Sequence, residues 1–303
     1  MSAQSALLTQ ARQAFHKMLV DQKVLTIVTT GKTPDIASNA DSSQDYSRQL
    51  AMHIANNLEA HTVDRKLPAQ TAGTLFEKFV AEFLITTLPI ISLGHPTGWH
   101  VENVGNSRKR DHLAQYWPYR HLDELQTKVQ ADRTLEAVLG NLYSVNPDVL
   151  VLRSALEDSV FNQHEKLVDD TTGQRSHIRA NKEQQHSDNN KSTSTIVHAV
   201  VSCKWTMRSD RAQNSRSEAL SLIRNRKGRT PHIVAVTAEP TPSRIASLAL
   251  GTGDLDMIYH FALDELITAV EAGHNDEGKA QLETLLNGDR LRDISDLPLD
   301  LVT

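Results

Sequence analysis

Residues 195–205 read TIVHAVVSCKW, and the chain continues as TMRSDRAQNSRSEAL to residue 220. The first part is rich in Val, Ile and Ala, a composition typical of a buried strand. Because side chains alternate along a strand, Ser202 and Lys204 share one face and Cys203 points to the other. The second part carries three arginines, an aspartate and a glutamate. A buried strand thus ends in a lysine and leads directly into a dense group of charges.

The composition of the 303-residue chain favours a folded protein of a reducing compartment. Hydrophobic residues make up 39%, and the formal net charge of −5 means that nucleic-acid binding would require a local basic patch. The single cysteine, Cys203, excludes an internal disulfide and fits the cytoplasm. The N-terminus lacks the signal-peptide pattern, and no apolar run approaches the roughly 20 residues that cross a bilayer. We therefore expect a cytoplasmic protein with no membrane partner.

Hydrophobic periodicity predicts one mixed α/β domain over residues 1–303. Helices are predicted at 5–20, 47–60, 71–88, 111–139, 215–226 and 261–273. Strands are predicted at 144–154, 195–205 and 231–240. The polar stretch 163–195 is interpreted as a surface loop or insertion, residues 29–47 as a long loop, and the tail 293–303 as extended.

Asp148 and Lys204 are the first pair of candidate site residues. Asp148 follows Pro147 at the start of an apolar run, where a carboxylate is commonly a turn or cap residue. Lys204 has an ordinary interpretation too, as an edge-strand lysine that opposes aggregation. If the two strands pair, however, the aspartate and the lysine come together. A carboxylate beside a lysine can bind Mg²⁺ and hold an attacking water, while the lysine stabilises developing negative charge.

One carboxylate of such a site is missing from the strand itself. Two residues before the lysine, where Asp or Glu is usual, the chain has Ser202, a poor metal ligand. Glu218 could replace it from the first turn of the next predicted helix, but Ser215-x-x-Glu218 also fits a capping box. The residues alone support cap and ligand about equally. Glu77, beside the apolar face of an earlier predicted helix, is a further candidate, although a glutamate there is more often half-exposed than catalytic.

The segment Arg208-Ser209-Asp210-Arg211 follows the strand directly. Arginine can bond O6 and N7 of guanine, and aspartate can accept from the cytosine amino group, so the segment suits G·C pairs. The ordinary alternative is a solvated loop with local ion pairs. From Arg208 to Arg229, seven Lys or Arg residues face two acidic ones. This local basic bias opposes the overall negative charge and would suit contacts with phosphates.

Taken together, these residues resemble the type II restriction endonucleases whose targets share a CCGG core. The resemblance extends over most of the chain apart from 163–195. It is carried by PD (147–148), SCK (202–204), RSDR (208–211), Glu218, SNAD (38–41), LPAQT (67–71), RNRKGR (224–229), VTAEPTPSRI (236–245) and DISDLPLDL (293–301). It implies a PD-(D/E)xK fold, in which a central mixed β-sheet is flanked by helices, with serine in the usual acidic position.

The resemblance also implies an activity, namely Mg²⁺-dependent hydrolysis of double-stranded DNA at a palindromic CCGG-core site, GCCGGC in the members it is most similar to, leaving 5′-phosphate ends. The implied site consists of Asp148 and Glu218 as Mg²⁺ ligands, Lys204 as a catalytic residue, and Ser202 and Glu77 completing it. The implied DNA contacts are Arg208, Asp210 and Arg211 to the inner CCGG, Arg244 to the outer pair, and Asp41 and Gln70.

As partners, the resemblance implies a tetramer of two back-to-back dimers and a companion DNA methyltransferase in the cell. Two other functions remain open from the sequence. A DNA-binding regulator without nuclease activity would keep the RSDR segment but need no carboxylate cluster. A repair or recombination nuclease of the same fold would cut according to DNA structure rather than sequence.

Overall fold

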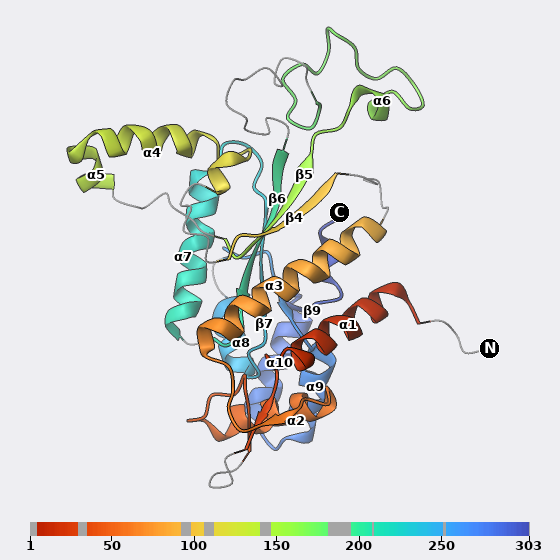
Figure 1. Cartoon of the computed structure of the whole chain (residues 1–303), viewed down its shortest axis with the longest axis vertical. Coiled ribbons are helices and arrows are strands. Elements are labelled where there is room, and N and C mark those ends of the chain that lie inside the picture. The colour runs from red at the N-terminus through yellow and green to blue at the C-terminus, as the bar shows by residue number, and fades with distance from the viewer. Residues whose placement is uncertain are drawn as a thin grey trace.

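A six-stranded mixed sheet organises the fold, with the strand order β4-β5-β6-β7-β8-β9. Figure 1 shows the sheet running through the middle of the molecule. Its strands are β4 (Trp99–Asn103), β5 (Val149–Ser154), β6 (Thr195–Lys204), β7 (His232–Thr237), β8 (Met257–His260) and β9 (Leu291–Asp293). The β4–β5 and β5–β6 pairings are antiparallel, and the three that follow are parallel. The sheet therefore changes direction at β6, the strand that carries Lys204.

The computed structural model describes most of the chain. The described residues are 5–29, 35–91, 98–105, 112–139, 147–180, 195–207, 209–250 and 253–302, with the backbone alone for 209–213. Arg208 lies outside them. Within these ranges, no helix is both long and apolar enough to cross a membrane.

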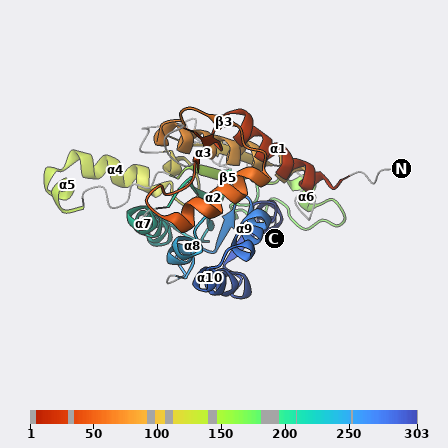
Figure 2. The ribbon, with the colours of Figure 1, turned by 90° about the horizontal axis from the view of Figure 1, so that it is seen from below.

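Helices lie on both faces of the sheet. The longer ones are α1 (Leu7–Asp21), α2 (Asp45–Asn57), α3 (Ala69–Thr87), α4 (His121–Ala131), α5 (Arg133–Leu139), α7 (Ser209–Asn225), α8 (Pro242–Ala249), α9 (Leu263–Ala272) and α10 (Asp276–Asn287). The shorter ones are η1 (Leu88–Ile90), η2 (Leu113–Gln115), α6 (Asp158–Phe161) and α11 (Leu297–Asp300). Figure 2 shows α2 and α3 on one side of the sheet and α7, α8 and α10 on the other, while α4 and α5 project away from the body.

Helix α3 packs on β4, β5 and β6 through the apolar face that its sequence predicts. Phe76, Val80 and Leu84 on this face are fully buried, and the Phe76 ring lies 5.3 Å from that of Trp205, just after β6. Such a stripe at helical spacing must face the core. This packing places the next residue along α3, Glu77, beside the strand that carries Lys204.

A second, small sheet takes one of its strands from the segment that the sequence predicts as a long loop. Its two-residue strands are β1 (Ile27–Val28), β2 (Ile36–Ala37) and β3 (Thr62–Val63), in the order β2-β1-β3. Directly after β2, the hydroxyl of Ser38 donates to the carbonyl of Val24 (2.6 Å) and accepts the N–H of Thr26 (3.1 Å). The residues up to Asp41 are therefore anchored to the core. The loop prediction is wrong for residues 36–37, which lie in β2, and for 45–47, which lie in α2, while the other described residues of the segment lie outside helices and strands.

The C-terminal tail also differs from its prediction. Only its first residue lies in β9; the chain then turns and forms α11. Pro298 stands at the start of this helix, where its fixed φ and missing N–H are tolerated. Leu297 and Leu301 are buried against the core. The extended prediction is therefore wrong beyond Asp293, because burial of leucines on one helical face outweighs the helix-breaking composition.

The helix after β6 begins earlier than predicted. The sequence indicates a start at Ser215, whereas α7 begins at Ser209 and ends at Asn225. Asp210 and Arg211 thus belong to the first turn of α7. The predicted helical stretch 111–139 is divided into η2, α4 and α5, with Asp111 outside the described residues.

The described part of the polar stretch 163–195 is mainly loop. Its described part, 163–180, contains no helix, and it is ordered around Arg179, which is 3% exposed. The Arg179 guanidinium donates to both carboxylate oxygens of Asp158 (Nε–Oδ1 2.6 Å and Nη2–Oδ2 2.8 Å). Residues 181–194 lie outside the described residues, and Thr195 is already the first residue of β6.

Candidate active site

Lys204 and Asp148 are in contact at the end of β6. The antiparallel register pairs Val149 of β5 with Val201 of β6, so Asp148, just before β5, is brought level with the last residues of β6. The Lys204 ammonium donates to Asp148 Oδ2 at 3.1 Å, and the main-chain N–H of Cys203 donates to the same oxygen at 2.7 Å. The strand pairing predicted from sequence therefore brings these two side chains together.

Asp148 is held through its main chain as well. Its carbonyl accepts the N–H groups of Val104 (3.0 Å) and Gly105 (3.3 Å), which follow β4. No hydrogen bond joins its other carboxylate oxygen, Oδ1, to a described residue. One oxygen is thus fixed by the protein, and the second is available to a ligand.

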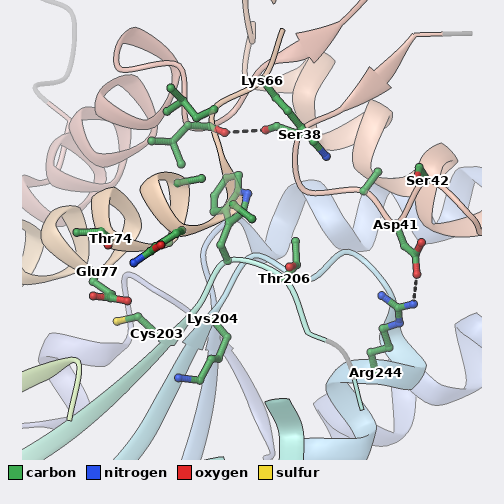
Figure 3. A pocket seen from close by; sticks show the side chains of 18 of the residues that line it. Ser38, Asp41, Ser42, Lys66, Thr74, Glu77, Cys203, Lys204, Thr206 and Arg244 are labelled. Carbon is green, nitrogen blue, oxygen red and sulfur yellow. Dashed lines mark hydrogen bonds and ion pairs between the residues drawn. The ribbon is translucent and has the colours of Figure 1, made fainter. Parts of the chain in front are cut away.

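A cavity of about 410 Å³ opens beside Lys204, between α3, α7, α8 and the segment after β2. Figure 3 shows this cavity, with Glu77 on one side near Cys203 and Asp41 and Arg244 facing each other on another. Six of the residues predicted from sequence line it, namely Asp41, Gln70, Glu77, Lys204, Glu218 and Arg244. Segments that are far apart in the sequence therefore line one cavity, which contains predicted catalytic residues and predicted DNA-binding residues.

Glu77 and Glu218 approach Lys204 from helices on opposite faces of the sheet. Burial, together with the charge of Asp148, raises the pKa of Glu77 to about 7, although Lys204 acts in the opposite direction. Burial also raises the pKa of Glu218, where the effect of Asp148 again opposes that of Lys204. Neither glutamate makes a hydrogen bond or ion pair with a described residue. The positive charge of Lys204 therefore does not fully offset the negative charges of the three carboxylates near it, those of Asp148, Glu77 and Glu218.

Lys204 remains the charged partner in this group. Burial alone would lower its pKa, but the carboxylates of Asp148 and Glu218 outweigh burial and raise the pKa above the usual lysine value of 10.5. The Lys204 side chain is 18% exposed. An ammonium group is therefore present at the cavity wall at neutral pH, where it can stabilise negative charge on a bound group.

Ser202 lies where an acidic residue is usual, and its hydroxyl is buried without a hydrogen-bond partner in the described structure. Together with Glu218 and Ser215, it lines a second, very small cavity of about 10 Å³. That volume is close to the space that one water or small ion occupies. An unpaired hydroxyl and a carboxylate beside such a space indicate a position for a polar ligand.

Glu218 is not a helix-capping residue. Since α7 begins at Ser209, Ser215 lies inside the helix rather than at its N-cap, and Glu218 falls in the third turn. The capping box and the first-turn position that the sequence suggests are therefore both wrong. The side chain of Glu218 instead lines the cavity beside Lys204.

The donor atoms are of the kind that Mg²⁺ takes. Mg²⁺ is bound through oxygen, through one or two carboxylates, and it keeps several waters. Asp148 Oδ1, the under-compensated carboxylate of Glu218 and the unpaired hydroxyl of Ser202 fit this chemistry. In the described part of the chain, no three His, Cys, Asp or Glu side chains form a group that could hold a metal ion by themselves. The site thus offers a partial set of oxygen ligands.

A second group of polar side chains is built around Arg244 at the start of α8. Its guanidinium is paired with the carboxylate of Asp41, and its Nη1 donates to the carbonyl of Met207 at 3.1 Å. Hydrogen bonds from Ser43 and Arg244 hold the pKa of Asp41 below its usual range. The structure thus brings together Arg244, which is predicted to contact the outer base pair, and Asp41, which is predicted to make a further DNA contact. Gln70, in the first turn of α3, lines the same cavity.

The side chains of the predicted DNA-reading segment, residues 208–211, are not described in the structure. Arg208 lies outside the described residues, and for Asp210 and Arg211 only the backbone in α7 is described. A neighbouring residue that the sequence did not single out is Glu239, which is 1% exposed and lies 3.7 Å from Arg244 Nη1. Its only sequence signal is an acidic residue near the end of a predicted apolar strand.

This chain is similar to known proteins over nearly its whole length. The family model described as the NgoMIV restriction enzyme matches residues 15–303. The type II restriction enzyme NgoMIV of Neisseria gonorrhoeae is 44% identical over 295 residues, which cover 97% of this chain and 98% of that one. Among solved structures, the complex of restriction endonuclease PspGI with substrate DNA matches over 97% of this chain and 91% of that chain, with 12% identity and a TM-score of 0.26. A likeness at that TM-score carries no argument.

The full-length match therefore identifies the class of protein as the type II restriction enzymes. Within that class, the chain belongs to the NgoMIV restriction enzyme family. The resemblance that the sequence motifs indicate is confirmed.

Proposed function

We propose that this enzyme hydrolyses double-stranded DNA at GCCGGC in a Mg²⁺-dependent reaction that leaves 5′-phosphate ends. The observation that carries the proposal is the contact between Lys204 Nζ and Asp148 Oδ2. Lys204 in turn lines the cavity that Arg244 and Asp41 also line. A phosphate held at Lys204 would lie close to side chains suited to reading a G·C pair. The motif resemblance in the sequence supplies the target.

We further infer that the sheet is a PD-(D/E)xK core in which serine replaces the usual acidic residue. The support is the pairing of β5 with β6, which sets Pro147-Asp148 beside the Ser202-Cys203-Lys204 segment. Glu218 on α7 is in a position to provide the missing carboxylate.

In this proposal, Asp148 and Glu218 hold the Mg²⁺ ion, with Ser202 beside them. When bound, the ion supplies Lewis-acid stabilisation of the phosphate oxygens. Lys204 donates hydrogen bonds to the scissile phosphate and to the attacking water, which orients the water and stabilises the charge that develops on the phosphate oxygens. The water attacks in line, and the bond to the 3′ oxygen breaks. Glu77, with a pKa of about 7, is suited to accept a proton near neutral pH.

DNA recognition is proposed to come from the opposite wall of the cavity. Arg244 would bond the guanine of the outer pair and Asp41 would accept from the paired cytosine amino group, with Gln70 adding a contact. The inner CCGG would be read by Arg208, Asp210 and Arg211. Because the target is palindromic, a symmetric dimer would place one such set on each half-site. We propose pairs of dimers, a companion methyltransferase and a cytoplasmic location on the same resemblance.

Digestion of a plasmid with a single GCCGGC site, with and without Mg²⁺, tests the proposal. We expect one double-strand cut at that site, only when Mg²⁺ is present, with 5′-phosphate at every end. Sequence-specific retention of the plasmid without any cut would favour a regulator. Cuts that follow branched or single-stranded DNA rather than GCCGGC would favour a repair nuclease.

A further inference from the structure

The most buried acidic side chain next to the cavity belongs to Glu239, in the turn between β7 and α8. The side chain is 1% exposed, and each of its two carboxylate oxygens accepts a hydrogen bond. Oε2 accepts the main-chain N–H of Met207 at 2.9 Å, and Oε1 accepts the main-chain N–H of Thr241 at 3.2 Å. A buried carboxylate is tolerated only where such donors replace water.

The first of these bonds fixes the backbone that leads into the predicted DNA-reading segment. Met207 is itself 1% exposed and is the last residue before Arg208, and α7 begins two residues later, at Ser209. The hydrogen bond to the Met207 N–H therefore anchors the chain two residues before the first turn of α7. Glu239 holds that N–H from another strand, across 32 positions in sequence.

The same carboxylate also holds the arginine that faces the cavity. Glu239 Oε2 lies 3.7 Å from Nη1 of Arg244, and this Nη1 donates to the carbonyl of Met207 at 3.1 Å. Burial raises the pKa of Glu239, while the Met207 N–H and Arg244 oppose that rise. Glu239, Met207 and Arg244 thus form a closed group in which each member contacts the other two.

We propose that Glu239 is a positioning residue for sequence discrimination. It fixes the position of Arg244, which is proposed to contact the outer base pair, relative to residues 208–211, which are proposed to contact the inner pairs. This inference rests on the proposed function of Arg244 and of the segment 208–211. Glu239 itself is buried and is not among the residues that line the cavity. Its expected effect is therefore on the choice of sequence, at the outer and the inner positions together.

The test is the variant Glu239→Gln, which keeps the shape of the side chain and removes its charge. An amide can accept one of the two N–H bonds, but its NH₂ group then faces a donor. A charged, buried hydrogen bond of this kind corresponds to about a tenfold to hundredfold change in an equilibrium constant. We expect Glu239→Gln to lose specificity by this factor at the outer and the inner positions, with affinity for random duplex unchanged.

The matched control is Glu265→Gln. Glu265 is also a mostly buried carboxylate paired with an arginine, Arg12 (Nη2–Oε2 2.6 Å), and it does not line the cavity. Both variants should lower the unfolding midpoint, but only Glu239→Gln should relax the selected sequence.

If Glu239→Gln cannot be obtained folded, a second variant is Glu239→Asp. Its side chain keeps the charge but is too short to hold both N–H groups, and it should relax the selected sequence in the same way.

The measurement is selection of bound duplexes from a randomised library by the full-length protein without Mg²⁺, followed by competition binding. Relaxation at outer and inner positions for Glu239→Gln, with Glu265→Gln unchanged, supports the inference. Three results overturn it: unchanged discrimination by Glu239→Gln, equal loss of specific and random affinity, or equal relaxation by Glu265→Gln. If the unmodified protein selects no sequence at all, the proposed function itself fails and this inference fails with it.

Discussion

Glu77 of α3 and Glu218 of α7 line the same cavity from opposite faces of the sheet, and Lys204 lies on the strand between them. Both carboxyl groups have raised pKa values, first because they are buried and also because Asp148 is near. A metal-free protein therefore contains unfavourable like-charge interactions at this site. A divalent cation would relieve them, so the site's titration and its cation binding can be measured without any cleavage assay.

Glu77 should make the metal-free protein less stable as the pH rises. Its pKa is raised from 4.5 to about 7 in the folded state, so between these values the folded protein keeps a proton that the unfolded chain has released. The free energy of unfolding then falls with rising pH, by at most about 1.4 kcal/mol per pH unit for this one group, and is constant above pH 7. In urea unfolding with EDTA from pH 4 to pH 8, the free energy of unfolding of Glu77→Gln should change less with pH than that of the unmodified protein. Identical slopes for the two proteins would contradict the raised pKa.

Glu218 should couple Mg²⁺ to folding stability. If it is a ligand, Mg²⁺ at about ten times its Kd should stabilise the unmodified protein by about 1.4 kcal/mol, and Glu218→Gln by much less. Without metal, Glu218→Gln should be at least as stable as the parent, because a buried, under-compensated carboxylate is removed. The control is Glu283→Gln on the exposed side of α10, which should keep the full Mg²⁺ response. A full Mg²⁺ response retained by Glu218→Gln would contradict the ligand role.

Arg244 should determine preference for the outer base pair. Loss of one bidentate contact to guanine costs about 1–3 kcal/mol of discrimination per half-site. We expect Arg244→Ala to bind GCCGGC and duplexes with altered outer pairs with nearly equal affinity, while the inner CCGG remains the stronger determinant. Arg292→Ala, which removes an arginine paired with Asp300 at 2.7 Å, is the control and should leave the preference unchanged. Competition binding without Mg²⁺ measures both; a uniform loss on all sequences would mean a phosphate contact.

The central strands and the Asp148–Lys204 contact could be predicted from sequence because their signals are local. β5, β6 and β7 are runs of Val, Ile, Leu and Ala that a buried sheet requires, and pairing of the first two brings the aspartate to the lysine. Short strands such as β4 and β8 carry mixed residues, and their sheet neighbours decide their conformation. No such local signal marked them.

The parts of the site that were missed depend on contacts between distant segments. The start of α7 at Ser209 lies in a charged run that has no hydrophobic periodicity. The position of Glu218 within the helix, and hence the choice between a capping role and a ligand role, could therefore not be predicted. Glu239 bonds to a main-chain N–H, at Met207, and no spacing of side chains reveals a backbone partner. Asp41 and Arg244 were predicted through family resemblance alone, and their ion pair joins residues 203 positions apart.

The central claim is that Asp148 and Lys204 act on one phosphate, and cleavage compared with binding by Lys204→Ala tests it most directly. The control is Lys17→Ala, since Lys17 pairs with Asp21 at the same 3.1 Å on an exposed helix face. We expect Lys204→Ala to cut a GCCGGC duplex at least about a hundredfold more slowly than the parent, while it binds that duplex with unchanged preference. Lys17→Ala should match the parent in both. Cleavage by Lys204→Ala at the parental rate would contradict the account.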